Sequence, residues 1–218
     1  MTLVAGVDDA GRGPVIGPLI IAGVLFHDHE IPRMKSLGVK DSKLLRPNER
    51  LRLDEKIKEI AVRYTYVEVT PDEIDRVVLR GKKLNRLNFL EAKAMAEAIK
   101  DLSPEIAYVD ASDVVEERFG RQIREMLPFE VRIVSEHKAD AKYMVVSAAS
   151  IIAKVRRDQV IARLREEYGD FGSGYSHDPR TRRFLLNWIQ RHGGLPDFVR
   201  KSWKTIKRLR EEATQTRL

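Results

Sequence analysis

Short apolar runs alternate with longer amphipathic stretches along this chain, and the pattern predicts an α/β protein. Five runs are apolar, contain β-branched or aromatic residues and have strand length: 3–7, 19–26, 64–69, 105–110 and 129–135. Elsewhere apolar positions recur every three or four residues, as they do on one face of a helix. Strands come first, helix and strand then alternate, and helices end the chain. This order is typical of a sheet core with a helical C-terminal part.

Local start signals place the predicted helices. Pro47 opens one helical stretch, and Thr70, Pro71 and Glu73 supply the cap, the first-turn proline and the capping-box acid of another. A further helix is expected over 87–102, and another between the fourth and fifth strands. One long helix is expected over 141–168, and two more follow beyond residue 175.

A glycine-rich segment, GDFGSGY at 169–175, interrupts the last long helix and sets the expected domain boundary. We expect a core over residues 1–168 and a C-terminal helical region over residues 169–218 that packs on this core. The length of 218 residues suits one large domain with such an appendage.

Composition excludes several classes of protein. The chain has no cysteine, which excludes disulfides and thiolate metal sites and suits the reducing cytoplasm where we expect the protein. No apolar run reaches the roughly 18 residues of a membrane-spanning helix, and the first residues show no secretory signal. We therefore expect no membrane association. No long apolar stripe is left unassigned, so we expect a monomer.

The charge is strongly basic and uneven. The formal net charge is +7, and the segment 201–218 has six basic residues against two acidic ones, which gives +4 of that total. A basic surface of this kind is typical of a protein with an acidic partner. A solvated helix face is the alternative interpretation, and charge alone leaves both open.

Aspartates lie where the predicted strands end. Asp8 and Asp9 follow the first strand, Asp110 ends the fourth, and Asp140 precedes the long helix. Ligands gather at the carboxyl ends of strands in open α/β sheets, so Asp8 and Asp110 share a crevice if their strands are neighbours. Two carboxylates at about 4 Å repel by about 4 kcal/mol at an effective dielectric near 20. Taken singly, each aspartate can equally be a turn or cap residue.

A divalent cation would remove this repulsion, and oxygen ligands favour Mg²⁺ or Mn²⁺. Two such ions about 4 Å apart are suited to phosphodiester hydrolysis. The sequence does not match two other motifs that bind phosphate groups. A dinucleotide fingerprint needs glycine where Ile16 stands, and no Gly-Lys-Ser/Thr sequence is present. An aspartyl phosphotransferase would need a second aspartate where Ala10 stands.

Five sequence blocks together resemble ribonuclease HII (type 2 ribonuclease H) of the archaeal type. In order they are GVDDAGRGPVIGP, GVKDSK, YVDASD, HKADAKYMVVSAASIIAKVRRD and FGSGYSHDPRTRRF, and the resemblance runs from Gly6 to about Trp203. It implies a ribonuclease H-like fold, a five-stranded mixed sheet flanked by helices with a C-terminal helical region. It also implies an endoribonuclease that cleaves the RNA strand of RNA/DNA hybrids and cuts 5′ of ribonucleotides embedded in DNA, with Mg²⁺ or Mn²⁺, leaving 5′-phosphate and 3′-hydroxyl ends.

The resemblance assigns catalysis and metal binding to four acids, which fall on Asp8, Asp9, Asp110 and Asp140. Asp9 departs from the family pattern, which has glutamate there. The aspartate side chain is one methylene shorter, so its carboxylate reaches roughly an ångström less far. Small displacements near the chemistry can cost on the order of 10²-fold in rate. The alternative is therefore a hybrid-binding protein with a catalytically impaired site.

The resemblance also implies substrate-binding residues. The glycine turn places backbone at the junction between ribonucleotide and deoxyribonucleotide, where the 2′-hydroxyl distinguishes RNA from DNA. A tyrosine stacks on the junction deoxyribose, and an Asp-Ser-Lys segment contacts phosphates. These roles fall on Gly11, Arg12, Gly13, Tyr175 and Lys43. Ser176 stands where the family commonly has proline. The sequence leaves open whether a replication clamp docks on the tail.

Three further groups of residues have structural interpretations. His27 and His29 are expected to be solvated, and Asp113 is expected to cap the following helix. Ser147 and Ser150, in the small-residue helix, are expected to serve close packing.

Overall fold

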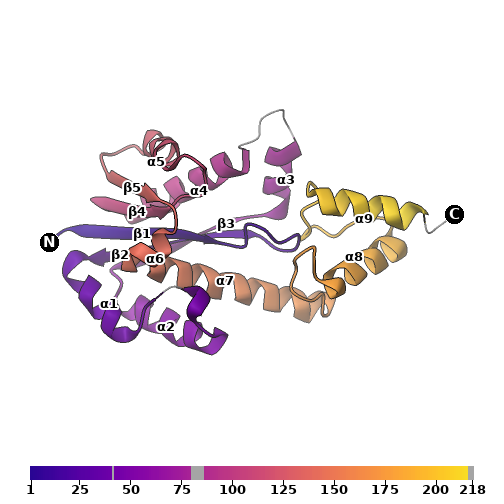
Figure 1. Ribbon diagram of the computed structural model, residues 1–218, viewed down its shortest axis with the longest axis horizontal. Helices are drawn as coiled ribbons and strands as arrows, with labels where there is room; N and C mark the ends of the chain where they lie inside the picture. Colours follow the sequence, from indigo (N-terminus) through magenta and orange to yellow (C-terminus); the bar gives the residue numbers. More distant parts are fainter. Residues whose placement is uncertain (41, 80–85, 216–218) are drawn as a thin grey trace. The chain divides into compact units, whose positions relative to one another are not determined.

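The structure is a computed structural model that describes residues 1–40, 42–79 and 86–215 (Figure 1). Asp41 of the Asp-Ser-Lys segment and Arg217 of the basic tail lie outside the described residues. None of the described helices has the length and apolar character needed to cross a membrane.

A five-stranded mixed sheet forms the centre of the fold, as predicted. Its strands are β1 (Leu3–Ala10), β2 (Leu19–His27), β3 (Arg63–Val69), β4 (Ile106–Asp110) and β5 (Arg132–Glu136). The strand order is β3-β2-β1-β4-β5. β1 pairs antiparallel with β2 and parallel with β4, and β4 pairs parallel with β5. The chain therefore returns by a crossover to place β4 beside β1.

The chain divides into two compact units, and the first, over residues 1–10, 20–68 and 84–156, holds nearly all of the sheet. Its helices are α1 (Ile31–Leu37), α2 (Pro47–Ile60), α4 (Arg86–Leu102), α5 (Glu116–Glu125), α6 (Ala139–Lys142) and the first part of α7 (Met144–Tyr168). Short 3₁₀ turns cover Asp28–Glu30 and Ser42–Leu44.

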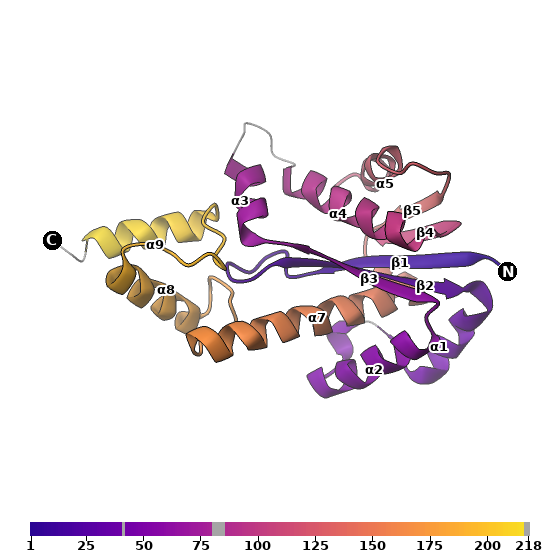
Figure 2. The same ribbon diagram turned by 180° about the vertical axis from the view of Figure 1, so that it is seen from behind.

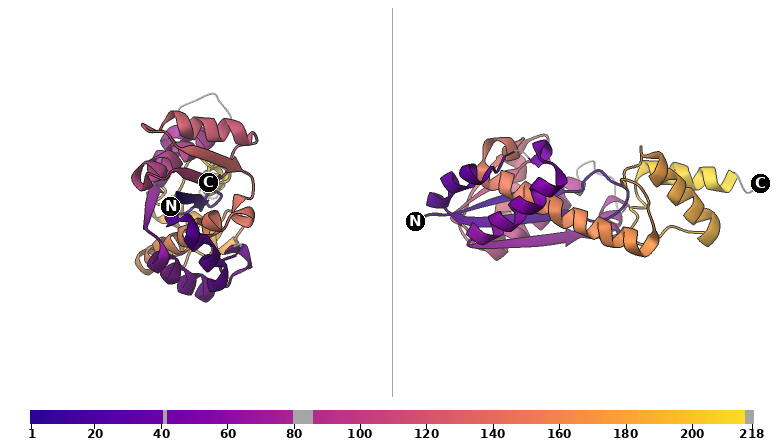
Figure 3. Two further views of the ribbon diagram at one scale, coloured as in Figure 1. Left: turned by 90° about the vertical axis from the view of Figure 1, so that its left-hand side faces the viewer. Right: turned by 90° about the horizontal axis from the view of Figure 1, so that it is seen from below.

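Helices cover both faces of this sheet. Apolar residues at alternate positions of β2, from Ile20 to Phe26, pack with α1, α2 and α7 in one core. On the opposite face, Gly23 of β2 lies against Ala98 and Leu102 of α4. Figures 1 and 2 show α4 and α5 on one side of the sheet and α1 and α2 on the other, and the left panel of Figure 3 shows the same layers end-on.

Gly6 is the point of closest approach between β1 and α7. A Cβ atom at Gly6 would lie 2.0 Å from the carbonyl oxygen of Val145. Only glycine lets the backbone of a strand come this close to the start of a helix. The contact fixes the first turns of α7 against the strand that carries Asp8 and Asp9.

The second compact unit, over residues 11–19, 69–83 and 157–218, draws on three separate parts of the chain. Its described helices are the end of α7, α3 (Pro71–Leu79), α8 (Pro179–His192) and α9 (Lys204–Gln215). Its core joins Val15 and Ile16 to Phe171, Leu185 and other apolar residues of these segments. The domain boundary expected at residue 168 stays a prediction.

Two predicted bounds differ from the structure in ways that bear on the site. β1 continues to Ala10, which pairs with Ile20, so Asp8 and Asp9 lie inside the strand instead of after it. The helix expected over 141–168 is interrupted at Tyr143, whose backbone is extended, and Asp140 belongs to the separate α6. In both cases pairing or packing with distant segments sets the bounds.

Candidate active site

Two aspartates lie side by side on neighbouring strands. Val7 of β1 is in register with Val109 of β4, so Asp8 and Asp110 occupy adjacent positions one residue further along. Side chains at equivalent positions of adjacent strands share a face of the sheet. Asp8 is buried, with 4% of its surface exposed, and Asp110 is half-buried. The strand order therefore brings together two acids separated by about a hundred residues of sequence.

The α6 segment brings a third acid to this place. Its first residue, Ala139, donates its backbone N–H to Oδ1 of Asp110 at 2.7 Å. Lys138, just before it, has a positive φ of 55°, a conformation that costs about 1–3 kcal/mol for a non-glycine residue. This turn buries Asp140 at 3% exposure, close enough to Asp110 for its charge to raise the Asp110 pKa.

Asp9 differs from these three acids in its orientation. Successive side chains of a strand point to opposite faces, so Asp9 points away from the face that Asp8 shares with α7. Its side chain is only half-buried, while its backbone N–H donates to Oδ1 of Asp8 at 2.7 Å. Asp9 is nevertheless near enough for its charge to raise the pKa of Asp8.

The buried acids carry a clear electrostatic cost. Burial raises the pKa of Asp8 well above its usual value, and the negative charges of Asp9 and Asp110 raise it further. Burial also raises the pKa of Asp110, with the Ala139 N–H opposing this effect. Crowded, dehydrated carboxylates of this kind favour a bound cation.

A buried network under Asp8 was missed by the sequence interpretation, which assigned Ser150 to packing. The Ser150 hydroxyl bonds to Asp8 and lies 2.9 Å from the hydroxyl of Ser42. Lys154 donates to Ser150 at 2.8 Å and also to Ser42, and its charge lowers the pKa of Asp8. A serine and a lysine four residues apart lie on one face of a helix, and this spacing is the only sequence signal for the network.

Lys43 contacts one of the four acids in the structure. Its ammonium group lies 2.9 Å from Oδ2 of Asp140, whereas Oδ1 of Asp140 is buried and has no hydrogen-bond partner in the part of the chain that the structure describes. A buried carboxylate oxygen without a partner is costly, and a cation would satisfy it.

The donor chemistry fits a divalent cation that takes oxygen ligands. Across residues 1–40, 42–79 and 86–215, however, no three His, Cys, Asp or Glu side chains are already arranged to hold a metal ion. The acids interact in pairs instead, Asp8 with Asp110 and Asp110 with Asp140. A cation that used all of them would have to draw them closer together and compete with Lys43 for Asp140.

The glycine turn belongs to the second unit. Gly11 and Gly17 have φ of 88° and 90°, which only glycine adopts readily. A Cβ atom at Gly13 would lie 3.5 Å from the Tyr175 ring, so the turn and the tyrosine are neighbours within this unit. Tyr175 is 38% exposed, so much of its ring is accessible to a ligand.

A fully buried arginine, which the sequence interpretation missed, anchors this turn. Arg200 donates from Nε to the Gly17 carbonyl at 3.0 Å, from one terminal nitrogen to the Arg12 carbonyl at 2.7 Å, and from the other to the Gly11 carbonyl. Its backbone N–H donates to the Val15 carbonyl at 2.9 Å. The conformation of the turn is thus fixed by four contacts from one distant residue.

The residues given structural interpretations follow them only in part. Asp113 was expected to cap α5, but the N-cap residue is Val115 and no side chain caps the helix. Asp113 instead accepts the backbone N–H of Val115 at 3.1 Å and pairs with Arg118. Of the two histidines expected to be solvated, His29 is exposed, but His27 is the last residue of β2 and is half-buried. Their rings stack with centroids 5.4 Å apart. The Ser147 hydroxyl is buried and has no hydrogen-bond partner within the described part of the chain.

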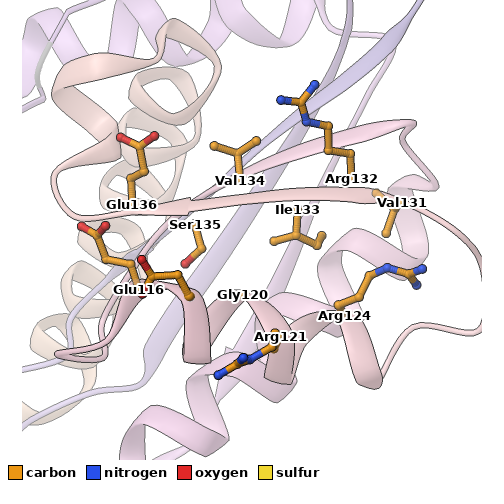
Figure 4. A pocket seen from close by; sticks show the side chains of 11 residues that line it. Glu116, Gly120, Arg121, Arg124, Val131, Arg132, Ile133, Val134, Ser135 and Glu136 are labelled. Carbon is orange, nitrogen blue, oxygen red and sulfur yellow. The ribbon is translucent and has the colours of Figure 1, made fainter.

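A pocket lies between α5 and β5 (Figure 4), and its lining includes Glu136, the register partner of Asp110, but none of the four acids. Glu116 and Glu136 line one end, and Arg121, Arg124 and Arg132 line the other. Several of these charges are already engaged: Glu136 accepts from Lys142 and Tyr143, and Arg124 pairs with Glu130. Because none of the four acids lines the pocket, it is not counted as part of the candidate site.

Comparison with known proteins shows the family and the fold. The family model for ribonuclease HII matches residues 5–206. A ribonuclease HII from Thermococcus sibiricus is 48% identical over 209 residues, covering 95% of this chain and 91% of the relative. The ribonuclease H2 structure from Pyrococcus horikoshii OT3 matches with a TM-score of 0.90 at 45% identity, covering 98% of this chain and 99% of that one. The PCNA:RNase HII complex from Archaeoglobus fulgidus matches with a TM-score of 0.84 at 47% identity, covering 95% and 96%. The predicted ribonuclease H-like fold is confirmed.

Proposed function

The chain belongs to the ribonuclease HII family and is a nuclease, and from this premise we propose its substrate and mechanism. It cleaves the RNA strand of RNA/DNA hybrids and cuts DNA on the 5′ side of an embedded ribonucleotide. The products carry 5′-phosphate and 3′-hydroxyl ends, and the reaction serves ribonucleotide excision.

The observation that carries this proposal is the line of acids on neighbouring elements, with Asp8 and Asp140 buried and Asp110 half-buried between them. These residues, with Asp9, would hold two Mg²⁺ or Mn²⁺ ions. Such ions supply Lewis acidity to the scissile phosphate and lower the pKa of an attacking water. Burial first, and then the charges of neighbouring acids, raise the pKa values of Asp8 and Asp110, and a cation would offset both effects.

The chain's other residues position the acids and the substrate. Ser150 and Lys154 hold the Asp8 carboxylate and favour its charged form. Lys43 exchanges its contact with Asp140 for a substrate phosphate. The Gly11–Gly13 backbone reads the ribose, where glycine allows close approach. Arg12 contacts a phosphate, and Tyr175 stacks on the neighbouring deoxyribose.

The test is nicking of a labelled DNA duplex that contains one ribonucleotide, with an all-DNA duplex as the control. We expect one cut on the 5′ side of the ribonucleotide in Mg²⁺ or Mn²⁺, and no cut in chelator. Cleavage of the all-DNA duplex at a similar rate, or no cleavage in either metal, would refute the proposed specificity or activity.

Family membership does not favour the alternative of a binding protein with an impaired centre. The short side chain of Asp9 still calls for a direct comparison with Asp9→Glu. We expect both forms to cut, with rates that differ by no more than about 10²-fold, because a small displacement near the chemistry can cost on the order of 10²-fold. Binding without cleavage by the present chain, together with cleavage by Asp9→Glu, would instead support the impaired centre.

A protein partner is suggested by one similar structure, in which a ribonuclease HII from Archaeoglobus fulgidus is in complex with PCNA. On this likeness we propose that a sliding clamp binds this chain, which is itself a monomer. Size-exclusion chromatography with light scattering tests both points. The chain alone should elute at its monomer mass, 25.0 kDa, and should co-elute with the clamp. Separate elution would refute the clamp proposal.

A further inference from the structure

Arg157, on α7 in the second unit, has an unusual environment for a charged residue. Only 13% of its side chain is exposed, and its Nε and one terminal nitrogen are buried with no hydrogen-bond partner among the described residues. The other terminal nitrogen lies 3.9 Å from the largely exposed carboxylate of Asp158. Burial lowers the pKa of Arg157, so the surroundings disfavour its charge.

This environment does not stabilise the free protein. A buried donor without a partner costs free energy, and replacing a poorly compensated buried charge by an apolar residue of similar size is often neutral or stabilising. Unpaired buried polar groups are rare in native structures and call for an explanation. Proteins tolerate such costs chiefly at functional sites.

The neighbours of Arg157 identify the function concerned. Its Nε and Cδ lie 2.7 Å from where a Cβ atom of Gly11 would be, so glycine at this position makes room for the arginine. Its guanidinium lies over the ring of Tyr175, 5.9 Å from the centroid. The same ring lies beside Gly13. Arg157 thus contacts Gly11 and Tyr175, two of the residues that bind the substrate in the proposed function.

We infer that Arg157 is a substrate-binding residue that takes a backbone phosphate of the nucleic acid. A guanidinium presents paired N–H donors that match two phosphate oxygens, and Nε with one terminal nitrogen forms such a pair. Binding includes a displacement of the partly exposed Tyr175 ring from the guanidinium. The inference rests on the proposed function, because the ligand is the phosphate of the strand that the enzyme cuts.

The experiment compares Arg157→Met with the wild type and with Arg156→Met, a control on the same helix. Arg156 pairs with Glu68 at 2.6 Å and therefore has its partner within the free protein. For each full-length protein two quantities are measured in chelator, where no cleavage occurs. They are the midpoint of thermal unfolding and the Kd for a duplex containing one ribonucleotide, at several salt concentrations.

We expect Arg157→Met to unfold at the same temperature as the wild type or higher, and to bind the duplex about tenfold more weakly. The slope of log Kd against log salt concentration should fall by about 0.9, the value for one phosphate contact. Arg156→Met should bind within about twofold of the wild type. The stability readout separates a ligand contact from a structural role, because loss of a structural contact would lower the unfolding temperature.

Two results would overturn the inference. One is unchanged affinity and salt slope in Arg157→Met. The other is a lower unfolding temperature together with weaker binding, because the affinity would then follow damage to the fold. Failure of the proposed function is distinguishable, since in that case the wild type would bind the duplex in chelator and would not nick it when metal is added.

Discussion

Replacement of Arg200 by methionine should destabilise the second compact unit selectively. The guanidinium donates three hydrogen bonds to carbonyls of the glycine turn, and methionine can make none of them. A hydrogen bond to a charged group contributes about 1.5–3 kcal/mol. Two of the three contacts are only part-buried, so we take the lower end of this range for each. For three bonds, the expected loss of unfolding free energy is about 4.5 kcal/mol, a large share of the 5–15 kcal/mol typical of a domain.

Both tryptophans of the chain, Trp188 and Trp203, lie in the second unit, so their fluorescence reports on this unit alone. Urea unfolding of Arg200→Met measures the loss of unfolding free energy. Tryptophan fluorescence reports it for the second unit, and circular dichroism reports it for the whole chain. Lys201→Met is the matched control, because the exposed Lys201–Asp197 pair at 3.2 Å should contribute at most about 1 kcal/mol. A fluorescence-detected loss below about 1 kcal/mol for Arg200→Met would refute the reasoning.

Three further predictions concern other parts of the chain. Asp178 accepts two backbone N–H groups, which lower its pKa from 3.8 to about 2. The contribution of ionised Asp178 to the unfolding free energy is therefore complete above about pH 4 and is lost towards pH 2. The difference in unfolding free energy between wild type and Asp178→Asn should shrink as the pH falls over that interval. Gly6→Ala should lower the unfolding free energy by about 3 kcal/mol or more through overpacking, and Gly194→Ala, with open space around it, should have little effect. Lys154→Met removes a charge that favours ionised Asp8, so the Mg²⁺ concentration for half-maximal cleavage should rise. An unchanged requirement would show that Lys154 does not act through Asp8.

Local signals in the sequence predicted the elements that depend on nearby residues. The capping box at the start of α3 is an example, because Glu73 accepts the Thr70 backbone N–H at 2.8 Å as the motif requires. The extent of β1 could not be predicted in this way. Asp8 and Asp9 break its apolar run, and only the pairing of Ala10 with Ile20 of β2 shows that the strand continues.

The same distinction applies to the candidate site. The proximity of Asp8 and Asp110 followed from their places in two strands, given that β1 and β4 are neighbours. Lys154 and Arg200 were missed because their partners lie more than a hundred residues away, at Ser42 and in the glycine turn. The local sequence around each of them resembles that of any basic helix or loop, so only the folded arrangement distinguishes them.

The long separation between Arg200 and its acceptors also orders events during synthesis of the protein. The carbonyls of Gly11 and Arg12 precede Arg200 by 189 and 188 residues, so the ribosome makes the turn first and its anchor almost last. At about 5–20 residues per second, the turn spends roughly 10–40 s without that anchor. A nascent chain that has not yet reached residue 200 therefore lacks the contacts that hold the glycine turn in its folded conformation.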